Sequence, residues 1–482
     1  MTSVSFLSYN VDGFASKTQD ADFVHFVNKF DFVCLLETFV SDVKTNVFSN
    51  YVMYVTPAIK LSNIGRKSGG VIVMVKKMFA KFVERIYLDC NNIITLKLSR
   101  NLFESNSDIF LVCAYLPPVN SPFYAVSDSN DGIEILETCI LQIVEKYGDV
   151  YFFICGDLNA RMANKQPIEK QSFELNFEQW NDESTEVYRN SQDQAENDFG
   201  KKLLDLCSVF DLNFLNGNCK GDKIGRYTFI SSTGNSVIDY FIISRAIADL
   251  PVTMTVEERI DSQHMPITCM LKRTKAIVSD SVNNRNVVLE KLVWDSNNET
   301  IFKEELNRYK DYFNLATNQV FSDIHKAVNV FTSILVDVSS CMQKKIMISN
   351  QERKRKWFDQ ECKTARTVAR QALRKYRSSN LDEDRDDYLS KRKDYKQLLR
   401  AKSDVYKNDM KNKIMNSIYE SKIFWSTLKS ISSKKNSKGN ISKEDWLSYF
   451  VTVFEATTSE QGSKEIIKDG GEVGDNFNLQ LN

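Results

Sequence analysis

Short apolar runs separated by turn residues fill the first part of the chain. VIVMV (71–75), IFLVCAY (109–115), VYFFICG (150–156) and VIDYFIIS (237–244) have the length and the β-branched and aromatic content of buried strands. A helical pattern, NDFGKKLLDLCSVFDL (197–212), lies between the last two of these runs. Strands and helices mixed over about 270 residues predict one layered α/β domain.

The second part of the chain changes to a pattern of long amphipathic helices. All seven prolines lie at or before Pro266, and no glycine occurs between Gly234 and Gly439. Residues 353–430 are rich in Lys, Arg, Glu, Asp, Ala and Leu and contain no helix breaker. We therefore predict an α/β domain over 1–273, a mostly α-helical and basic region over 284–456, and a disordered tail over 457–482.

Charge changes sign near the same boundary. The 482 residues contain 63 basic and 63 acidic residues, so the formal net charge is zero. Residues 1–275 hold 27 basic and 34 acidic residues, whereas residues 276–482 hold 36 and 29. Lys and Arg on helices gain affinity for phosphate backbones by releasing counterions. The helical region is therefore a candidate nucleic-acid contact, with a solvated surface of i,i+4 ion pairs as the alternative.

Several protein classes are disfavoured by the composition. No stretch approaches 18 uninterrupted apolar residues, so we predict no membrane span, and the first residues lack the pattern of a secretory signal. The ten cysteines contain no CxxC pair, which argues against zinc modules and a disulfide framework and favours a reducing compartment. Only three histidines are present, so few residues could serve a mechanism that needs an imidazole.

Polar residues close or interrupt the apolar runs at six places in the first domain. A carboxylate at the edge of an apolar run loses hydration unless a cation or a hydrogen bond compensates it. For any single residue a capped strand end is the simpler explanation, but six such places together indicate a functional site. The residues are Asn10 with Asp12, Glu37, Tyr115, Asp157 with Asn159, Asp239 and His264.

The chemistry of this set suits metal-assisted hydrolysis of a phosphate ester. Glu37, Asp157 and the carboxamide oxygens form a hard, oxygen-rich set of the kind that Mg²⁺ or Mn²⁺ prefers. Asp239 could fix the tautomer of His264 and favour its charged form. A hard metal with an imidazolium favours attack of water on a phosphate, where negative charge builds on the phosphoryl oxygens.

The same residues resemble the endonuclease/exonuclease/phosphatase superfamily. The order and spacing agree along residues 1–273, and the GDLNAR form and Tyr115 are similar to apurinic-type endonucleases of non-LTR (LINE-like) retrotransposons. The resemblance implies a DNase I-like four-layered α/β sandwich with its site at one edge of two packed sheets. It rests on YNVDG (9–13), LLET (35–38), CAYLPP (113–118), CGDLNAR (155–161), GRYTFISSTGNSVIDYFIIS (225–244) and SQHMPI (262–267).

The resemblance also implies a role for each residue. The metal ligands would be Glu37, as the principal one, with Asn10, Asp12 and Gln263. Asp157 would orient or deprotonate the attacking water, and Asn159 would hold this water or the scissile phosphate. Tyr115 would support the phosphate, and His264 with Asp239 would stabilise the developing charge. The substrate-binding residues would be Arg161, Thr228 and Ser236, although Thr228 is also explained as a strand residue and Ser236 by structural hydrogen bonding.

One position departs from the family. This chain has Ser262-Gln263-His264 where the family usually has Ser-Asp-His. A glutamine keeps an oxygen ligand but loses one negative charge, so we expect a lower metal affinity. Asp261 could replace the missing carboxylate only if the backbone shifted. We therefore expect a weakened activity or an altered metal preference, with complete loss of activity as the alternative.

The basic region resembles the segment that links endonuclease to reverse transcriptase in such elements. No YxDD-type polymerase segment is present, so we expect either an element product truncated before the polymerase or a gene derived from such an element. RKRK (353–356) is a candidate nuclear-import signal, and the resemblance implies a nuclear protein. The similar segments are KRKWFDQECKTAR (354–366), YKQLLRAKSDVYK (395–407), IFWSTLKSI (423–431) and ISKEDWLSYFVTVF (441–454).

The leading hypothesis from the sequence is a Mg²⁺-dependent (or Mn²⁺-dependent) endonuclease that nicks DNA and leaves a 3′-hydroxyl. Element RNA is a further candidate partner for the basic helices, and the oligomeric state is open. Two alternatives remain. One is another phosphodiesterase or phosphatase of the superfamily, and the other is a catalytically weakened or dead nucleic-acid-binding protein.

Overall fold

The computed structural model divides into two compact units, Met1–Ser403 and Asp404–Asn482. The acidic insertion at 169–187 and the predicted tail at 457–482 lie outside the residues that it describes. Those residues are 2–42, 47–61, 65–88, 90, 92–126, 131–167, 189–273, 287–292, 296–310, 324–348, 355–417 and 420–431.

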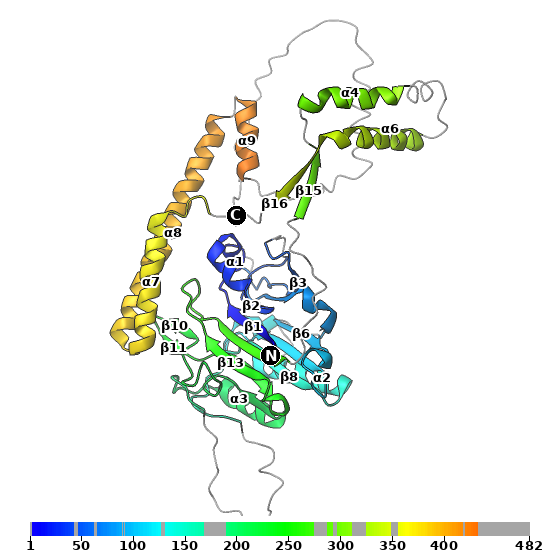
Figure 1. Cartoon of the computed structure of the whole chain (residues 1–482). Helices are drawn as coiled ribbons and strands as arrows, with labels where there is room; N and C mark the ends of the chain where they lie inside the picture. Colours follow the sequence, from blue (N-terminus) through cyan, green and yellow to red (C-terminus); the bar gives the residue numbers. More distant parts are fainter. Residues whose placement is uncertain are drawn as a thin grey trace, which may run out of the picture. The chain divides into compact units, whose positions relative to one another are not determined.

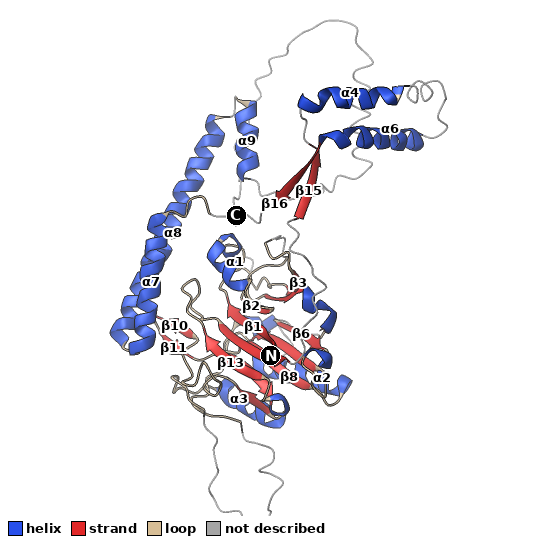
Figure 2. Ribbon diagram, viewed as in Figure 1, coloured by secondary structure: helices blue, strands red, loops and turns tan. Residues whose placement is uncertain are grey.

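Two six-stranded mixed sheets form the centre of the first unit (Figures 1 and 2). The first sheet has the order β13 (Pro251–Val256), β14 (Ile267–Arg273), β1 (Thr2–Asn10), β2 (Phe32–Leu36), β4 (Val71–Lys76) and β3 (Tyr51–Thr56). The second has the order β5 (Val83–Ile86), β6 (Ile93–Leu98), β7 (Ile109–Tyr115), β8 (Tyr151–Asp157), β12 (Asp239–Ser244) and β9 (Leu212–Phe214).

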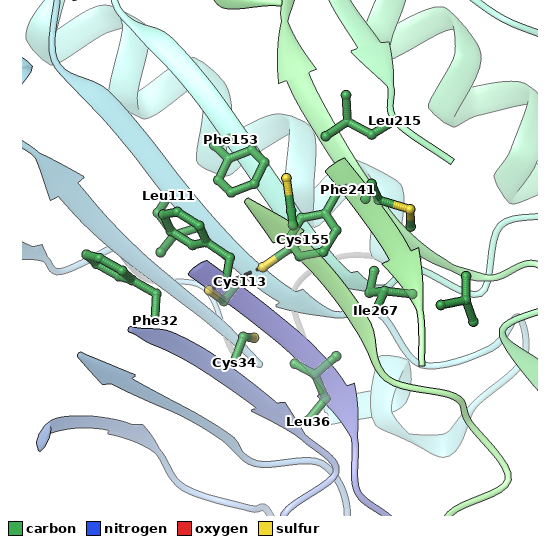
Figure 3. Close-up of a cluster of buried hydrophobic side chains, with 14 of the residues drawn as sticks. Phe32, Cys34, Leu36, Leu111, Cys113, Phe153, Cys155, Leu215, Phe241 and Ile267 are labelled. Carbon is green, nitrogen blue, oxygen red and sulfur yellow. Dashed lines mark hydrogen bonds between the residues drawn. The ribbon is translucent and has the colours of Figure 1, made fainter. Parts of the chain in front are cut away.

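Alternate residues of these strands face the core between the sheets. Because side chains alternate along a strand, Phe6 of β1 belongs to this core whereas Leu7 belongs to the core on the opposite face. Figure 3 shows side chains of β2, β7, β8 and β12 meeting between the sheets. Three thiols lie there, and Cys155 Sγ donates to Cys113 Sγ at 3.6 Å, close to Cys34. Cys113 and Cys155 are thus buried.

Helices cover the outer faces of the sheets and complete the four layers. Residues of α1 (Ala21–Val27) pack on the outer face of the first sheet. Residues of α2 (Gly132–Tyr147) and α3 (Asp198–Val209) pack on the outer face of the second sheet. Asp131 caps α2 by accepting from Glu134 N, and Asn197 caps α3 by accepting from Gly200 N. The predicted α/β sandwich is confirmed.

The region beyond the sandwich is mostly helical, as predicted, but it also contains a pair of strands. β15 (Val287–Leu292) and β16 (Gln343–Ile348) pair antiparallel across a long separation that no local turn signal marks. None of the described helices is both long and apolar enough to cross a membrane. These helices are α4 (Glu299–Arg308), α6 (Ile324–Val338), α7 (Gln360–Ser379), α8 (Asp382–Asn416) and α9 (Ser421–Ile431).

Helix α7 and the first turns of α8 pack against the sandwich. Asn380, with a φ of 55°, ends α7 and makes the tight turn into α8. The contacts place α7 and α8 up to Ser403 in the same unit as the sandwich, and the domain boundary after Arg273 stays a prediction. The buried residues shared by this hairpin and the sandwich core include Ala369, Leu373, Tyr376, Tyr388 and Tyr395 with Val256 and Ile260.

Candidate active site

The polar residues that end the strands meet at one edge of the two sheets. β1 runs parallel to β2, and β7 runs parallel to β8, so the carboxyl ends of each pair point the same way. β12 and β14 run antiparallel to their neighbours and bring their amino ends there. In the second sheet Tyr115, Asp157 and Asp239 are direct neighbours across β7, β8 and β12. Hydrogen bonds between the sheets join the two edges into one site.

Four buried side chains form a continuous polar line across this edge. Asn10 Nδ2 donates to Asp157 Oδ2 at 2.9 Å, and the same oxygen lies 3.7 Å from His264 Nε2. His264 Nδ1 lies 2.9 Å from Asp239 Oδ2. The imidazole is therefore held between two carboxylates, and the structure brings the predicted pair of His264 and Asp239 into direct contact.

A second pair of predicted residues lies beside this line. The Tyr115 hydroxyl donates to Glu37 Oε1, which joins the end of β7 to the residue that follows β2. Burial, together with the charges of Glu37 and Asp157, raises the pKa of Tyr115 well above its usual value. Asn159 N donates to Asp157 Oδ1 at 3.2 Å, and its side chain donates to Leu116 O. Glu37, Tyr115 and Asn159 thus surround Asp157.

The electrostatics of the site push the pKa values of its acid and its imidazole upward. Burial raises the pKa of Asp157 to about 7, with Asp239 and Glu37 adding to it and His264 and Asn10 opposing it. Burial alone would lower the pKa of His264, but the Asp239 and Asp157 carboxylates outweigh it and raise that pKa to about 9. The site therefore combines a carboxyl group that can change protonation near neutral pH with a cationic imidazole.

Three site residues have a left-handed backbone, which non-glycine residues adopt at a cost. The φ angles are 45° at Asp12, 48° at Glu37 and 49° at Asn159. Asn and Asp tolerate this region, but Glu37 does not share that tolerance. Its backbone is held because Gly13 N donates to Glu37 O and Thr38 N donates to Gly70 O. Strain of this kind clusters at functional sites, which supports a functional role for this edge.

Other residues predicted at or near the metal site lie at its margin. Asp12 is paired with Arg66 at 3.1 Å and is partly exposed. Gln263 is also partly exposed, and its backbone carbonyl accepts from Ile230 N at 3.0 Å. Asp261 cannot replace the missing carboxylate from where it lies, because its Oδ1 accepts from Arg259 Nε at 2.8 Å. Neither Asp12 nor Asp261 therefore replaces the carboxylate that the family usually has at position 263.

The predicted substrate-binding residues have structural partners. Arg161 forms a two-point ion pair with Asp193, at 2.9 and 2.6 Å. Thr228 is fully buried, and its Oγ1 accepts from the backbone N–H groups of Ile238 and Asp239. Ser236 is buried in β11 (Gly234–Ser236), where its carbonyl accepts from Thr228 N. These contacts position β12 and the Asp239 carboxylate, and a substrate contact by these three residues stays a prediction.

Two positioning residues were missed from the sequence. Asn216 is buried, donates to Asp239 O at 3.1 Å and accepts from Phe241 N at 3.1 Å, so its amide fixes the start of β12. Ser262 Oγ donates to Asn10 O at 2.7 Å and accepts from His264 N at 3.2 Å. The run NGN (216–218) marks a turn in the sequence, but nothing in it shows that its first residue reaches β12.

Replacing Thr228 with valine is expected to lower both stability and activity. Valine keeps the shape but leaves two buried N–H groups without an acceptor, at a cost of about 1–3 kcal/mol in the free energy of unfolding. Because one of these groups belongs to Asp239, we also expect the catalytic rate to fall by about tenfold, which 1.4 kcal/mol would produce. Urea unfolding and the rate of phosphate-ester hydrolysis measure the two effects. Thr233→Val, at an exposed threonine, is the control, and equal behaviour of the two variants would contradict this role.

The residues at this edge fit a hard divalent cation. Glu37, Asp157 and Asp239 bring three carboxylates to one largely buried place, while His264 supplies a single cationic group there. Burial is the main cause of the raised pKa of Asp157, and the charges of Asp239 and Glu37 add to it. Oxygen donors of this kind suit Mg²⁺ or Mn²⁺ better than softer metals. Glu37 and Asn10, beside Asp157, are the residues that would hold the ion.

The sequence and the structure were compared with those of known proteins. The sequence profile of the Endonuclease/Exonuclease/phosphatase family matches residues 7–264, more than half of the chain and the whole of the site. No curated protein sequence matches the chain.

The AP endonuclease LMAP from Leishmania major is similar in structure, with 15% identity and a TM-score of 0.41. The match covers 56% of this chain and 88% of that one. The endonuclease domain of TRAS1, a telomere-specific non-LTR retrotransposon, has 18% identity and a TM-score of 0.36. The match covers 57% of this chain and 100% of that one. The 3′ phosphatase NExo from Neisseria, solved with a product DNA hairpin, has 13% identity and a TM-score of 0.37. The match covers 56% of this chain and 99% of that one.

Proposed function

Because the chain belongs to the Endonuclease/Exonuclease/phosphatase family, we propose that it is a divalent-metal-dependent endonuclease that nicks DNA and leaves a 3′-hydroxyl. The observation that carries this proposal is the buried line of Asn10, Asp157, His264 and Asp239 beside the pair of Glu37 and Tyr115. The choice of DNA rests on the GDLNAR segment and the basic helices, which resemble those of retrotransposon endonucleases.

In the proposed reaction Asp157 receives the proton of the attacking water. Asn10 Nδ2 and Asn159 N hold its two carboxylate oxygens, and its raised pKa suits a base that works near neutral pH. His264, kept cationic and oriented by Asp239, faces this group with Nε2 and stabilises the charge that builds on the phosphoryl oxygens. A bound Mg²⁺ would supply further charge neutralisation at the phosphate. Attack of the water oxygen on phosphorus would break the bond to the 3′ oxygen, which would take up a proton from solvent and so remain as the hydroxyl.

A panel of substrates separates this proposal from its enzymatic alternative. Full-length protein is incubated with Mg²⁺ or Mn²⁺ and supercoiled plasmid, a duplex with an abasic site, or an inositol phosphate. We expect nicking of undamaged plasmid, with less turnover of inositol phosphate. Phosphate release from the inositol phosphate without plasmid nicking would point to a phosphatase. Binding of DNA without turnover of any substrate would point to the catalytically dead alternative.

Replacing Gln263 with aspartate is expected to raise the activity at low metal concentration. The new carboxylate restores one negative charge beside the proposed metal ligands, so we expect the Mg²⁺ concentration for half-maximal nicking to fall by about tenfold, equivalent to 1.4 kcal/mol. A Mg²⁺ titration of plasmid nicking measures this shift. Gln263→Glu serves as the control for charge placed one methylene further out. An unchanged titration curve for Gln263→Asp would show that this residue does not influence the metal.

A further inference from the structure

Asn92 is a buried residue that joins the two sheets at the edge where the candidate active site lies. It immediately precedes β6 and is 1% exposed. Its backbone carbonyl accepts from Tyr115 N at 3.0 Å, and its side-chain Oδ1 accepts from Gly70 N at 3.2 Å. One residue therefore connects the end of β7 in the second sheet to the turn that leads into β4 in the first.

This turn in its own right holds the segment that follows Glu37. Gly70 O accepts from Thr38 N at 3.1 Å, and Gly69 O accepts from Phe39 N at 3.0 Å. Glu37 and Phe39 both have left-handed backbones, with φ angles of 48° and 56°, so the segment needs such bonds to keep its conformation. The position of the Glu37 carboxylate thus depends on where the turn lies.

The contact between Asn92 and the turn is close-packed. A Cβ atom at Gly69 would lie only 2.4 Å from Asn92 Oδ1, so the turn cannot move toward this side chain. Asn92 also carries two costs, a left-handed backbone with a φ of 60° and a buried Nδ2 without a hydrogen-bond partner among the described residues. A glycine would avoid both costs, which indicates that this position needs the carboxamide oxygen.

We propose that Asn92 is a positioning residue that sets Glu37 against Tyr115 and thereby controls the affinity of the site for its divalent metal. The Tyr115 hydroxyl donates to Glu37 Oε1, and Asn92 holds the backbone on both sides of this contact. Residues that orient a metal ligand from behind affect metal affinity without touching the ion. This inference rests on the proposed function, in which Glu37 is a residue that would hold the metal.

Mn²⁺ binding by the full-length chain, followed by the electron paramagnetic resonance signal of the free ion, tests this role without any turnover. Asn92→Gly tolerates the left-handed backbone but removes the carboxamide, so we expect the Kd for Mn²⁺ to rise by about tenfold. Asn120→Gly makes the same change at an exposed asparagine with a φ of 65° and should bind Mn²⁺ as the wild type does. Urea midpoints show that each variant is folded during the measurement.

Gly69→Ala tests the same contact from its other side. The added Cβ would displace the turn, so this variant should also bind Mn²⁺ more weakly, but less so in the Asn92→Gly background, where the clash is relieved. Gly148→Ala is its control, because Gly148 has a similar φ of 72° but nothing within 4 Å of an added Cβ. If Asn92→Gly does not fold, Gly69→Ala measured against Gly148→Ala decides the question.

The outcomes separate this role from the endonuclease proposal. Wild-type Mn²⁺ affinity in folded Asn92→Gly, or an equal loss of affinity in Asn120→Gly, would show that Asn92 does not position the metal site. Nicking is scored separately on the same proteins. A chain that nicks plasmid while Asn92→Gly binds Mn²⁺ normally refutes only the role of Asn92, whereas a chain that shows the expected Mn²⁺ affinities but never nicks refutes only the endonuclease.

Discussion

Replacing His264 with alanine is expected to lower the rate of plasmid nicking by about 10²–10³-fold, the usual cost of removing one group that stabilises charge in the transition state. The imidazole lies between Asp157 and Asp239, so its loss removes the cationic group and leaves two buried carboxylates facing each other. Initial nicking rates at saturating Mg²⁺ measure the effect. His25→Ala, at an exposed histidine of α1, is the matched control and should nick at the wild-type rate.

A second substitution separates a catalytic role of His264 from a structural one. In Asp239→Asn the imidazole remains but loses the carboxylate that keeps it charged and oriented. If the two residues act as a unit, the double variant should be about as slow as His264→Ala alone, because effects within one unit do not add. Full additivity of the two rate effects would contradict the pairing, and a His264→Ala variant that nicks normally would remove His264 from the mechanism.

Replacing Tyr388 with alanine is expected to destabilise the first unit by about 3 kcal/mol or more, the usual cost of removing a large buried aromatic side chain. Tyr388 is fully buried and belongs to the core cluster that α7 and α8 share with the sandwich. The loss should therefore appear as a lower urea midpoint for the whole unit. We also expect nicking to become heat-sensitive, because Ile260 and the residues leading to His264 lie under the hairpin.

The hydroxyl of Tyr388 offers a matched control. It is buried and has no hydrogen-bond partner among the described residues, so Tyr388→Phe removes an unsatisfied polar group and should be at least as stable as wild type. If Tyr388→Ala left the midpoint unchanged, the hairpin would not be an integral part of the unit. A midpoint lowered equally by Tyr388→Phe would instead show that the hydroxyl has a partner.

Local patterns were sufficient to predict a layered α/β domain and the polar strand ends that the structure brings together, whereas the sandwich itself was implied by the family resemblance. Strands such as β7 and β8 are short, continuous apolar runs, and they end at the polar residues Tyr115 and Asp157. The position of each polar residue at a strand end can be read from the local sequence alone. Because parallel neighbours end at the same edge, these residues had to meet. The direct contact of His264 with Asp239 has a similar cause, because β12 and β14 both begin at this edge of the sheets.

Other features depend on contacts that local patterns do not encode. The left-handed backbone of Glu37 is held by distant glycines, since Gly13 N donates to Glu37 O and Gly70 O accepts from Thr38 N, and Asn216 acts on β12 across a buried contact. The docking of α7 and α8 was also missed. Arginines among other charged residues suggest a solvated surface, and only the structure shows that Arg366 meets Asp20 across the interface. The pairing of β15 with β16 is similarly non-local.

The central claim is that this edge of the sandwich hydrolyses a DNA phosphodiester with the help of a divalent metal. Its most direct test follows the conversion of supercoiled plasmid to nicked circles by the full-length chain, with Mg²⁺ or Mn²⁺ and with EDTA, alongside His264→Ala. We predict nicked circles only for the wild-type chain with metal, and nicks that a DNA polymerase can extend because they carry a 3′-hydroxyl. Nicking that persists in EDTA or in His264→Ala, or no nicking by the wild-type chain with either metal, would contradict the account.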